Sequence, residues 1–307
     1  MALDFPSAPT NGQIYDRYVW NNTLGVWSLL SDTTVFGLAS NTPTGSYTSG
    51  ADYEYVSFTS DGTLTVTRGG FFDCLLVGGG GAGGVGYGGG GGAGGMLYVE
   101  NAYLPTGSLD VVVGAGGLGR DDQGNAGSQG GNGDASSLWK YFAPGGGGGA
   151  GFAIRYSSSS IESAAGQNGG SGSGASGLNT GSLSAGGLGV PTLGNDGGQG
   201  NASSGGGGGG AGAVGSNAPS ASAGGDGGTG LSNSITGSAV TYAGGGGGAG
   251  PSSGGAGGSG GGASGTVNTT PTAATATTGG GGGATYTSGL GPGGAGGSGI
   301  VIVRWRA

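Results

Sequence analysis

Three acidic residues offer the first candidate chemistry in this sequence. Asp121 and Asp122 precede Asp134 by a short stretch that also contains Asn125 and Asn132. Carboxylate and amide oxygens are the ligands that Ca²⁺ takes in proteins, so these side chains could form an oxygen cage. Their spacing is not that of a known calcium loop, and Asn-Gly steps are ordinary turn chemistry. A solvated loop is therefore favoured, and calcium binding near Asp121, Asp122 and Asp134 stays open.

Other catalytic chemistry lacks its usual residues. The chain has no histidine, which removes the base of Ser-His-Asp and Cys-His nucleophiles and a common zinc ligand. Glycine runs such as Gly78–Gly81 match the dinucleotide-binding pattern, but more glycine follows where a helix should begin, and the single lysine, Lys140, is distant. Between Ser163 and Val303 only Asp196 and Asp226 are charged. We predict no enzymatic activity and no cofactor.

Charge and hydropathy narrow the range of partners. Fifteen acids against seven bases give a net charge of −8, and the bases are scattered, whereas a nucleic-acid binder needs a basic stripe. No apolar stretch approaches the ~18 residues of a membrane span, and Met1–Pro6 does not resemble a signal peptide. We expect cytoplasmic synthesis, no nucleic-acid partner and no membrane insertion. The single cysteine, Cys74, lies in an apolar run and is predicted to be a buried thiol.

Glycine dominates the composition, with 92 of 307 residues. Collagen would need glycine at every third position and abundant proline, and Gly78–Gly84 already breaks that phase. The main alternative is a flexible low-complexity chain. Because glycine loses the most conformational freedom on ordering, a folded version must recover that loss through backbone hydrogen bonds and close packing.

Short apolar segments placed between the glycine runs argue against a flexible chain. They are predicted to be buried strands, and they are Phe71–Val77, Met96–Val99, Leu109–Val113 and Ile300–Val303. The intervening runs could lie side by side as polyproline-II-type helices, whose backbone groups point outward with threefold spacing and can bond to neighbouring helices. The longest runs are Gly78–Gly81, Gly88–Gly92, Gly145–Gly149, Gly205–Gly210, Gly244–Gly248 and Gly279–Gly283.

Residues 1–68 differ from the rest in being rich in aromatic residues and in period-two alternation, which predicts β structure. One hairpin is expected between Ile14–Trp20 and Val26–Leu30. A second is expected between Tyr53–Thr59 and Thr63–Thr67, because Asp61-Gly62 is a strong turn signal.

Two parts of the sequence resemble known phage proteins. Phe5–Tyr15, with Trp20-Asn21 and Val26-Trp27, resembles a short β module found near the N-termini of phage structural proteins, where it serves attachment. Residues 71–307 resemble the glycine-rich domain of phage tail fibres and adhesins. The motifs that carry this second resemblance are Cys74–Gly84, Val111–Gly117, Gly131–Ser137 and Gly296–Arg304.

The resemblance implies a mainly β fold with polyglycine II. A β module over residues 1–68 would be the virion anchor and oligomerisation region, and residues 69–307 would form a sandwich of packed polyglycine helices closed by short strands. The implied function is that of a non-enzymatic virion protein, a tail fibre or adhesin that contributes to host attachment. A capsid decoration or head fibre is the alternative, and ice binding ranks lower because flat tripeptide repeats are missing.

The resemblance also implies partners and a location. We expect a homotrimer in the virion, assembled in the host cytoplasm, in contact with other virion proteins and with a host polysaccharide or outer-membrane protein. Candidate anchor contacts, which have the residue types of interface anchors, are Tyr15, Arg17, Tyr18, Trp20 and Trp27. Candidate receptor contacts, for each of which sealing the edge of the glycine core is the favoured role, are Trp139, Tyr141, Phe142, Phe152, Tyr156, Tyr242 and Tyr286.

Overall fold

The fold is mainly β, as the sequence predicts. The computed structural model of the chain describes residues 10, 14–15, 18–21, 26–29, 36–49, 52–120, 129–151, 165–177, 183–286 and 292–307; between residues 14 and 29 it describes the backbone alone. Within these residues the chain forms strands β1 to β17 and no helix.

The first three strands form an antiparallel sheet of their own. They are β1 (Ile14–Tyr15), β2 (Tyr18–Asn21) and β3 (Val26–Leu29), in the order β1-β2-β3. Trp20 lies opposite Trp27 across β2 and β3, so the first predicted hairpin is confirmed, although Ile14–Trp20 is divided between two strands. Within the described residues these strands pair only with one another.

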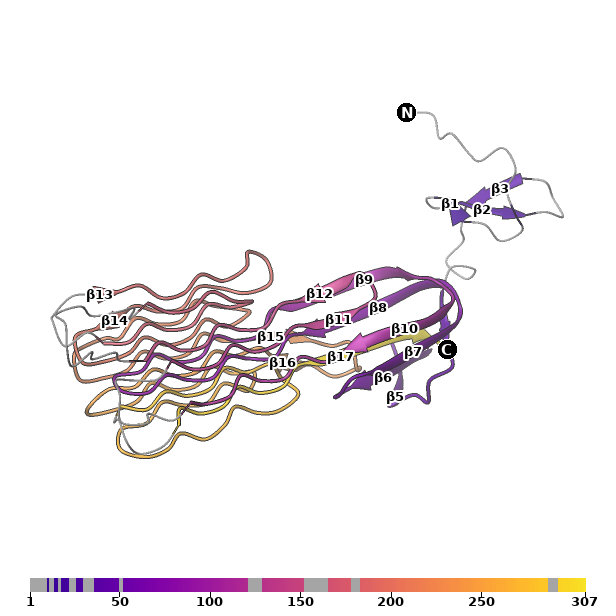
Figure 1. Cartoon of the computed structure of the whole chain (residues 1–307). Coiled ribbons are helices and arrows are strands. Elements are labelled where there is room, and N and C mark those ends of the chain that lie inside the picture. Colours follow the sequence, from indigo (N-terminus) through magenta and orange to yellow (C-terminus); the bar gives the residue numbers. More distant parts are fainter. Residues whose placement is uncertain are drawn as a thin grey trace, which may run out of the picture.

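Two five-stranded antiparallel sheets pack against each other as a sandwich (Figure 1). Their orders are β12-β11-β10-β7-β4 and β5-β6-β17-β8-β9. The strands are β4 (Leu38–Ala39), β5 (Gly45–Thr48), β6 (Asp52–Phe58), β7 (Gly62–Arg68), β8 (Gly70–Val77), β9 (Met96–Leu104), β10 (Gly107–Val112), β11 (Ser136–Leu138), β12 (Tyr141–Ala143) and β17 (Ile300–Arg306).

The sandwich core comes from alternate residues of the two sheets, as the period of two in a strand requires. Phe72, Cys74 and Leu76 of β8 face inward beside Val301, Val303 and Trp305 of β17. They meet a layer from the opposite sheet that includes Leu64, Val66, Leu109, Val111 and Leu138. All four apolar segments predicted as buried strands lie in this sandwich, and Cys74 is a buried free thiol as predicted.

The second predicted hairpin is wrong. β6 pairs with β5 and β17, whereas β7 pairs with β4 and β10, so the turn at Asp61-Gly62 carries the chain from one sheet to the other. The chain does turn at Asp61-Gly62, but β6 and β7 do not pair with each other. The boundary expected between residues 68 and 69 therefore falls inside two sheets that take strands from both of its sides.

Beyond the sandwich the chain runs back and forth in extended glycine-rich segments that form a slab (Figure 1). Residues 78–84 continue directly from β8, and residues 88–95 lead back into β9. Two short strand pairs lie along the slab. They are β13 (Leu183–Ser184) with β14 (Gly200–Asn201), and β15 (Leu231–Asn233) with β16 (Val240–Tyr242).

Backbone hydrogen bonds between glycine runs repeat every third residue. In the run 78–84, residues 78, 81 and 84 donate to the run 88–95, residues 79 and 82 donate to 129–135, and residues 80 and 83 donate to 292–299. The carbonyl groups of the same run accept bonds from residues 146 and 149, from residue 117, and from residues 282 and 285. One run thus bonds to neighbours on all sides.

At most positions the runs pack with no room for a side chain, and the buried exceptions are small residues such as Ala82, Ala93 and Ala249. Residues 88–95 and 242–250 are buried throughout. A Cβ atom added to Gly246 would overlap the carbonyl oxygen of Gly282, and one added to Gly147 would overlap that of Gln167. Most glycines of the slab meet backbone in the same way, so their lack of a side chain is a packing requirement.

We predict that Gly246→Val destabilises the protein far more than Ser252→Val, because Ser252 is exposed in a turn. The added side chain forces backbones apart and breaks their hydrogen bonds, at a cost of at least about 3 kcal/mol. Scanning calorimetry should show a melting temperature at least about 6 °C below that of the wild type. Equal melting temperatures for the two variants would contradict the packed slab.

Candidate functional site

The side chains with chemical potential lie on the outer face of the sheet β5-β6-β17-β8-β9. Because side chains alternate along a strand, Asp73 and Phe71 of β8 and Arg304 and Arg306 of β17 point away from the sandwich core. Asp73 and Arg304 are direct cross-strand partners. The distance between Arg304 Nη2 and Asp73 Oδ2 is 2.5 Å, and the Arg304 Nε to Asp73 Oδ2 distance is 3.0 Å.

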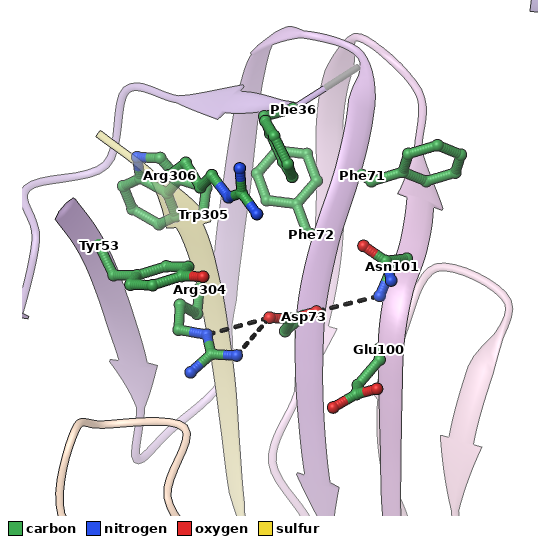
Figure 2. A pocket seen from close by; sticks show the side chains of 10 residues that line it. All are labelled: Phe36, Tyr53, Phe71, Phe72, Asp73, Glu100, Asn101, Arg304, Trp305 and Arg306. Atoms are coloured by element: carbon green, nitrogen blue, oxygen red, sulfur yellow. Dashed lines mark hydrogen bonds and ion pairs between the residues drawn. The ribbon is translucent and has the colours of Figure 1, made fainter. Parts of the chain in front are cut away.

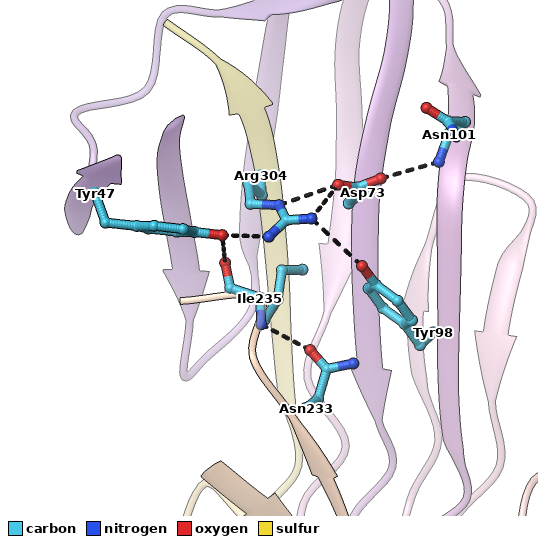
Figure 3. Close-up of polar contacts among 7 residues, drawn as sticks. All are labelled: Tyr47, Asp73, Tyr98, Asn101, Asn233, Ile235 and Arg304. Atoms are coloured by element: carbon cyan, nitrogen blue, oxygen red, sulfur yellow. Dashed lines mark hydrogen bonds and ion pairs between the residues drawn. The ribbon is translucent and has the colours of Figure 1, made fainter. Parts of the chain in front are cut away.

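This ion pair is the centre of a polar network (Figure 3). Arg304 Nη1 donates to the hydroxyl of Tyr47 on β5, and that hydroxyl donates to the carbonyl oxygen of Ile235 at 3.3 Å. Arg304 Nη2 also lies 3.5 Å from the hydroxyl of Tyr98 on β9. Asp73 Oδ1 accepts the backbone N–H of Asn101 at 3.0 Å. The network therefore joins four strands of the sheet, β5, β8, β9 and β17, to the β15–β16 hairpin, which comes from the slab.

Burial and these contacts set the protonation states of the network. Burial alone would lower the pKa of Arg304, but the hydrogen bonds and negative charge of Asp73, with the Tyr47 hydroxyl, raise it above its usual value. Burial, together with the charge of Asp73, raises the pKa of Tyr98 to about 12. Arg304 is thus charged and Tyr98 is neutral at neutral pH.

A pocket opens beside the network at the C-terminal end of β17, and Figure 2 shows the side chains that line it. Its volume is about 220 Å³. The guanidinium carbon of Arg306 lies 3.9 Å from the ring centroid of Phe36, and that of Arg304 lies 4.7 Å from the ring centroid of Tyr53. The pocket is lined by Phe36, Tyr53, Phe71, Phe72, Asp73, Glu100, Asn101, Arg304, Trp305 and Arg306. It combines acidic and basic side chains with aromatic walls.

The structure brings three of the predicted receptor contacts together in the β11–β12 hairpin. Trp139 occupies the turn with a φ of 51° and is 45% exposed, and Phe142 is 56% exposed. Tyr141 packs against the sandwich core, and burial raises its pKa. The Lys140 ammonium lies 4.6 Å from the Trp139 ring centroid and 5.5 Å from that of Tyr141. The hairpin thus carries an exposed aromatic tip.

The remaining predicted contacts do not join this tip. Tyr242 is only 5% exposed and seals the junction between the slab and the sandwich, where burial raises its pKa. Tyr286 lies where the run 279–285 ends, with its ring edge-to-face against that of Tyr87 and the centroids 5.0 Å apart. Phe152 and Tyr156 lie outside the described residues.

The anchor and calcium candidates are placed only in part. Tyr15, Tyr18, Trp20 and Trp27 lie on β1, β2 and β3 with their side chains undescribed, and Arg17 lies outside the described residues. Asp121 and Asp122 also lie outside them, while Asp134 is exposed. Among the residues that the structure describes, no group of three or more His, Cys, Asp or Glu side chains could hold a metal ion.

Sequence reasoning missed the pocket and its ion pair. A signal was present, because Asp73 interrupts the apolar segment Phe71–Val77 and Arg304 follows directly on Ile300–Val303. A charge inside an otherwise buried strand needs a partner. What the sequence does not reveal is that the two charges are partners, since 231 positions separate them.

Comparison with known proteins gives one family. The model of a family described as a glycine-rich domain matches residues 58–306. No curated protein sequence matches the chain. In the described part of the chain, no helix is long and apolar enough to cross a membrane.

We predict that raising the pH from 9 to 12 destabilises the folded protein and that Tyr98→Phe reduces this loss. Because the pKa of Tyr98 is raised to about 12 in the folded state, its contribution to stability is complete below the ordinary tyrosine pKa near 10 and disappears as the pH approaches 12. Urea unfolding at each pH measures the effect. Identical pH dependence for the wild type and Tyr98→Phe would contradict the assignment.

Proposed function

Because the chain belongs to the glycine-rich domain family, we propose that it is a non-enzymatic structural protein of a bacteriophage particle, a tail fibre or adhesin that contributes to host attachment. The observation that supports this most is the hydrogen-bonded slab, because phage fibre tips use glycine-rich domains of the kind that this sequence resembles. A virion location, reached after assembly in the host cytoplasm, is part of the proposal.

We also propose that the runs of the slab are polyglycine II helices. The three-residue repeat of their hydrogen bonds is the spacing at which backbone groups leave such a helix. Bonding of the run 78–84 to neighbours on all sides supports the same conformation. A slab held together mainly by backbone hydrogen bonds is stiff, and stiffness suits a protein that must hold a binding surface away from a particle.

The distribution of side chains supports a role without catalysis. Histidine is absent from the chain, and only Asp196 and Asp226 are charged between Ser163 and Val303. The charged pair at the centre of the described network, Asp73 and Arg304, is engaged in holding strands and the β15–β16 hairpin together.

The slab has two unlike ends, which suggests a division of labour. The sandwich closes one end, and the turns around β13 and β14 lie at the other (Figure 1). We propose that β1–β3, with Tyr15, Tyr18, Trp20 and Trp27, form the virion anchor and the trimer contact. The sandwich and the slab would then both extend from the particle towards the host, where a polysaccharide or an outer-membrane protein is the receptor.

The attachment role predicts that the purified chain competes with phage for the host surface. Adsorption of the phage that encodes the chain should fall at least tenfold when host cells are first saturated with the protein, because receptors are occupied. Antibodies against the chain should label the particle tail in electron micrographs. Capsid labelling without competition would favour the alternative, a decoration or head fibre, and the absence of labelling would contradict a virion location.

The anchor role predicts that deletion of residues 1–35 leaves a folded protein that no longer joins particles. Strands β1–β3 pair only with one another in the described part of the chain, so their removal spares both five-stranded sheets. Light scattering should report three copies for the full chain and one for the shortened chain. Normal incorporation of the shortened chain would place the attachment surface in the remaining residues.

A further inference from the structure

We propose that the pocket at the end of the sandwich binds one uncharged pyranose ring of a polysaccharide. This inference rests on the proposed function, since it assigns part of the host contact to a defined site. The proposed contact then lies on the sheet β5-β6-β17-β8-β9 and not at the aromatic residues of the glycine-rich part. Phe36 and Tyr53 come from the first part of the chain, and Arg304 and Arg306 come from the last.

The pocket holds hydrogen-bonding groups that the described part of the chain leaves unused. Within the part of the chain that the structure describes, neither the carboxylate of Glu100 nor the guanidinium of Arg306 has a hydrogen-bond or ion-pair partner. Glu100 can accept through two oxygens, and Arg306 can donate through a planar fork. The side-chain amide of Asn101 adds a donor and an acceptor at the rim. Adjacent hydroxyl groups of a sugar act as donor and acceptor, so they match this set.

The charges of the pocket favour a ligand without net charge. Asp73 and Arg304 neutralise each other, because their side chains are 18% and 16% exposed and joined at 2.5 Å. This leaves one carboxylate, Glu100, and one guanidinium, Arg306. A charged ligand would be attracted by one and repelled by the other, whereas hydroxyl groups can bond to both.

Aromatic rings supply the second element of a sugar site. Phe71 stands edge-to-face with Tyr103, with ring centroids 6.2 Å apart, and Tyr53 stacks on Tyr47 at 5.4 Å. Both Phe71 and Tyr53 line the pocket (Figure 2). A pyranose presents a flat array of C–H bonds, which packs on an aromatic face while its hydroxyl groups bond to polar side chains.

Size and polarity distinguish a sugar from an apolar side chain of a partner protein. A volume of about 220 Å³ lies below the range of typical drug sites and suits one small ring. The accessible lining is mostly polar. An apolar side chain of a partner protein would bury the Glu100 carboxylate and the Arg306 guanidinium without hydrogen-bond partners. Burying polar groups without such partners is costly.

A local distortion of β9 places the polar rim. The register between β8 and β9 shifts opposite Asp73, where Glu100 and Asn101 lie. Asn101 has a φ of 53°, in the left-handed region, and its N–H bonds to Asp73. Irregularities of this kind re-aim side chains and are frequent at functional sites. The ion pair thus fixes the backbone that presents Glu100 and Asn101 to the pocket.

Saturation-transfer NMR with the full-length protein tests the site. The probes are glucose, galactose, mannose and N-acetylglucosamine, with glucuronic acid as the charged comparison. We expect millimolar binding of at least one neutral sugar and weaker binding of the acid. Glu100→Ala and Arg306→Ala should each weaken binding at least about tenfold, because each removes a hydrogen bond that involves a charged group.

Two matched variants serve as controls. Asp134→Ala removes an exposed carboxylate from the glycine-rich part, and Trp139→Ala removes the exposed aromatic tip; both should bind like the wild type. Melting temperatures within about 2 °C of the wild type verify that all variants are folded, and Arg306→Lys replaces Arg306→Ala if the latter is not. No sugar binding, unchanged affinity in the pocket variants, or loss only in Trp139→Ala would each overturn the proposal.

The result is separable from that of the proposed function. If the protein blocks phage adsorption but Glu100→Ala blocks it equally well, the attachment role stands and the pocket is not its sugar site. If sugar binding depends on Glu100 and Arg306 but the chain is absent from particles, the pocket stands and the virion role falls.

Discussion

The structure depends on one constraint, the pairing of buried backbone groups without side chains. In most proteins strands and helices satisfy this need while side chains fill the space between them. Here the runs bond directly to one another, every third residue towards a given neighbour, and the carbonyl groups that receive those bonds occupy the space where Cβ atoms would lie. Only glycine permits that approach, which explains the high glycine content of the runs; alanine occupies only a minority of their buried positions, such as Ala82, Ala93 and Ala249.

The sandwich supplies what such a slab lacks, an apolar core that fixes the ends of its runs. Leu75 and Val77 of β8, with Ile300 and Ile302 of β17, form a second core with Ile235 and Tyr242 of the β15–β16 hairpin. The strands that enter the slab are therefore held by ordinary hydrophobic burial where they leave it. Arg304 strengthens the same junction, since its contact with Tyr47 reaches the carbonyl oxygen of Ile235. The sandwich and the slab thus stabilise each other where they meet.

Local sequence patterns are enough to predict which segments form strands, but they do not predict which strands pair with each other. Phe71–Val77 and Ile300–Val303 were predicted because apolar runs of that length read as buried strands wherever they lie. The hairpin expected at Asp61-Gly62 failed because a turn signal reports only that the chain reverses, and each flanking strand joins a different sheet. The pocket depends on pairs such as Asp73 and Arg304, 231 positions apart, which no period or motif connects. The exposed tip at Trp139 was among the predicted contacts because an aromatic cluster is visible in the sequence itself.

The same constraint determines where chemistry can reside in this protein. The interior of the slab holds only small side chains, such as those of Ala82, Ala93 and Ser171, so larger functional groups must lie in its turns, on its surface or in the sandwich. The sandwich has the charged pair and the pocket, and it takes strands from before and after the glycine-rich segments. Substitutions at Glu100 or Arg306 leave every run of the slab untouched, whereas a substitution at Gly246 does not. The proposed sugar contacts and the glycines that hold the slab together are therefore different residues, so the proposed site could change while the slab is preserved.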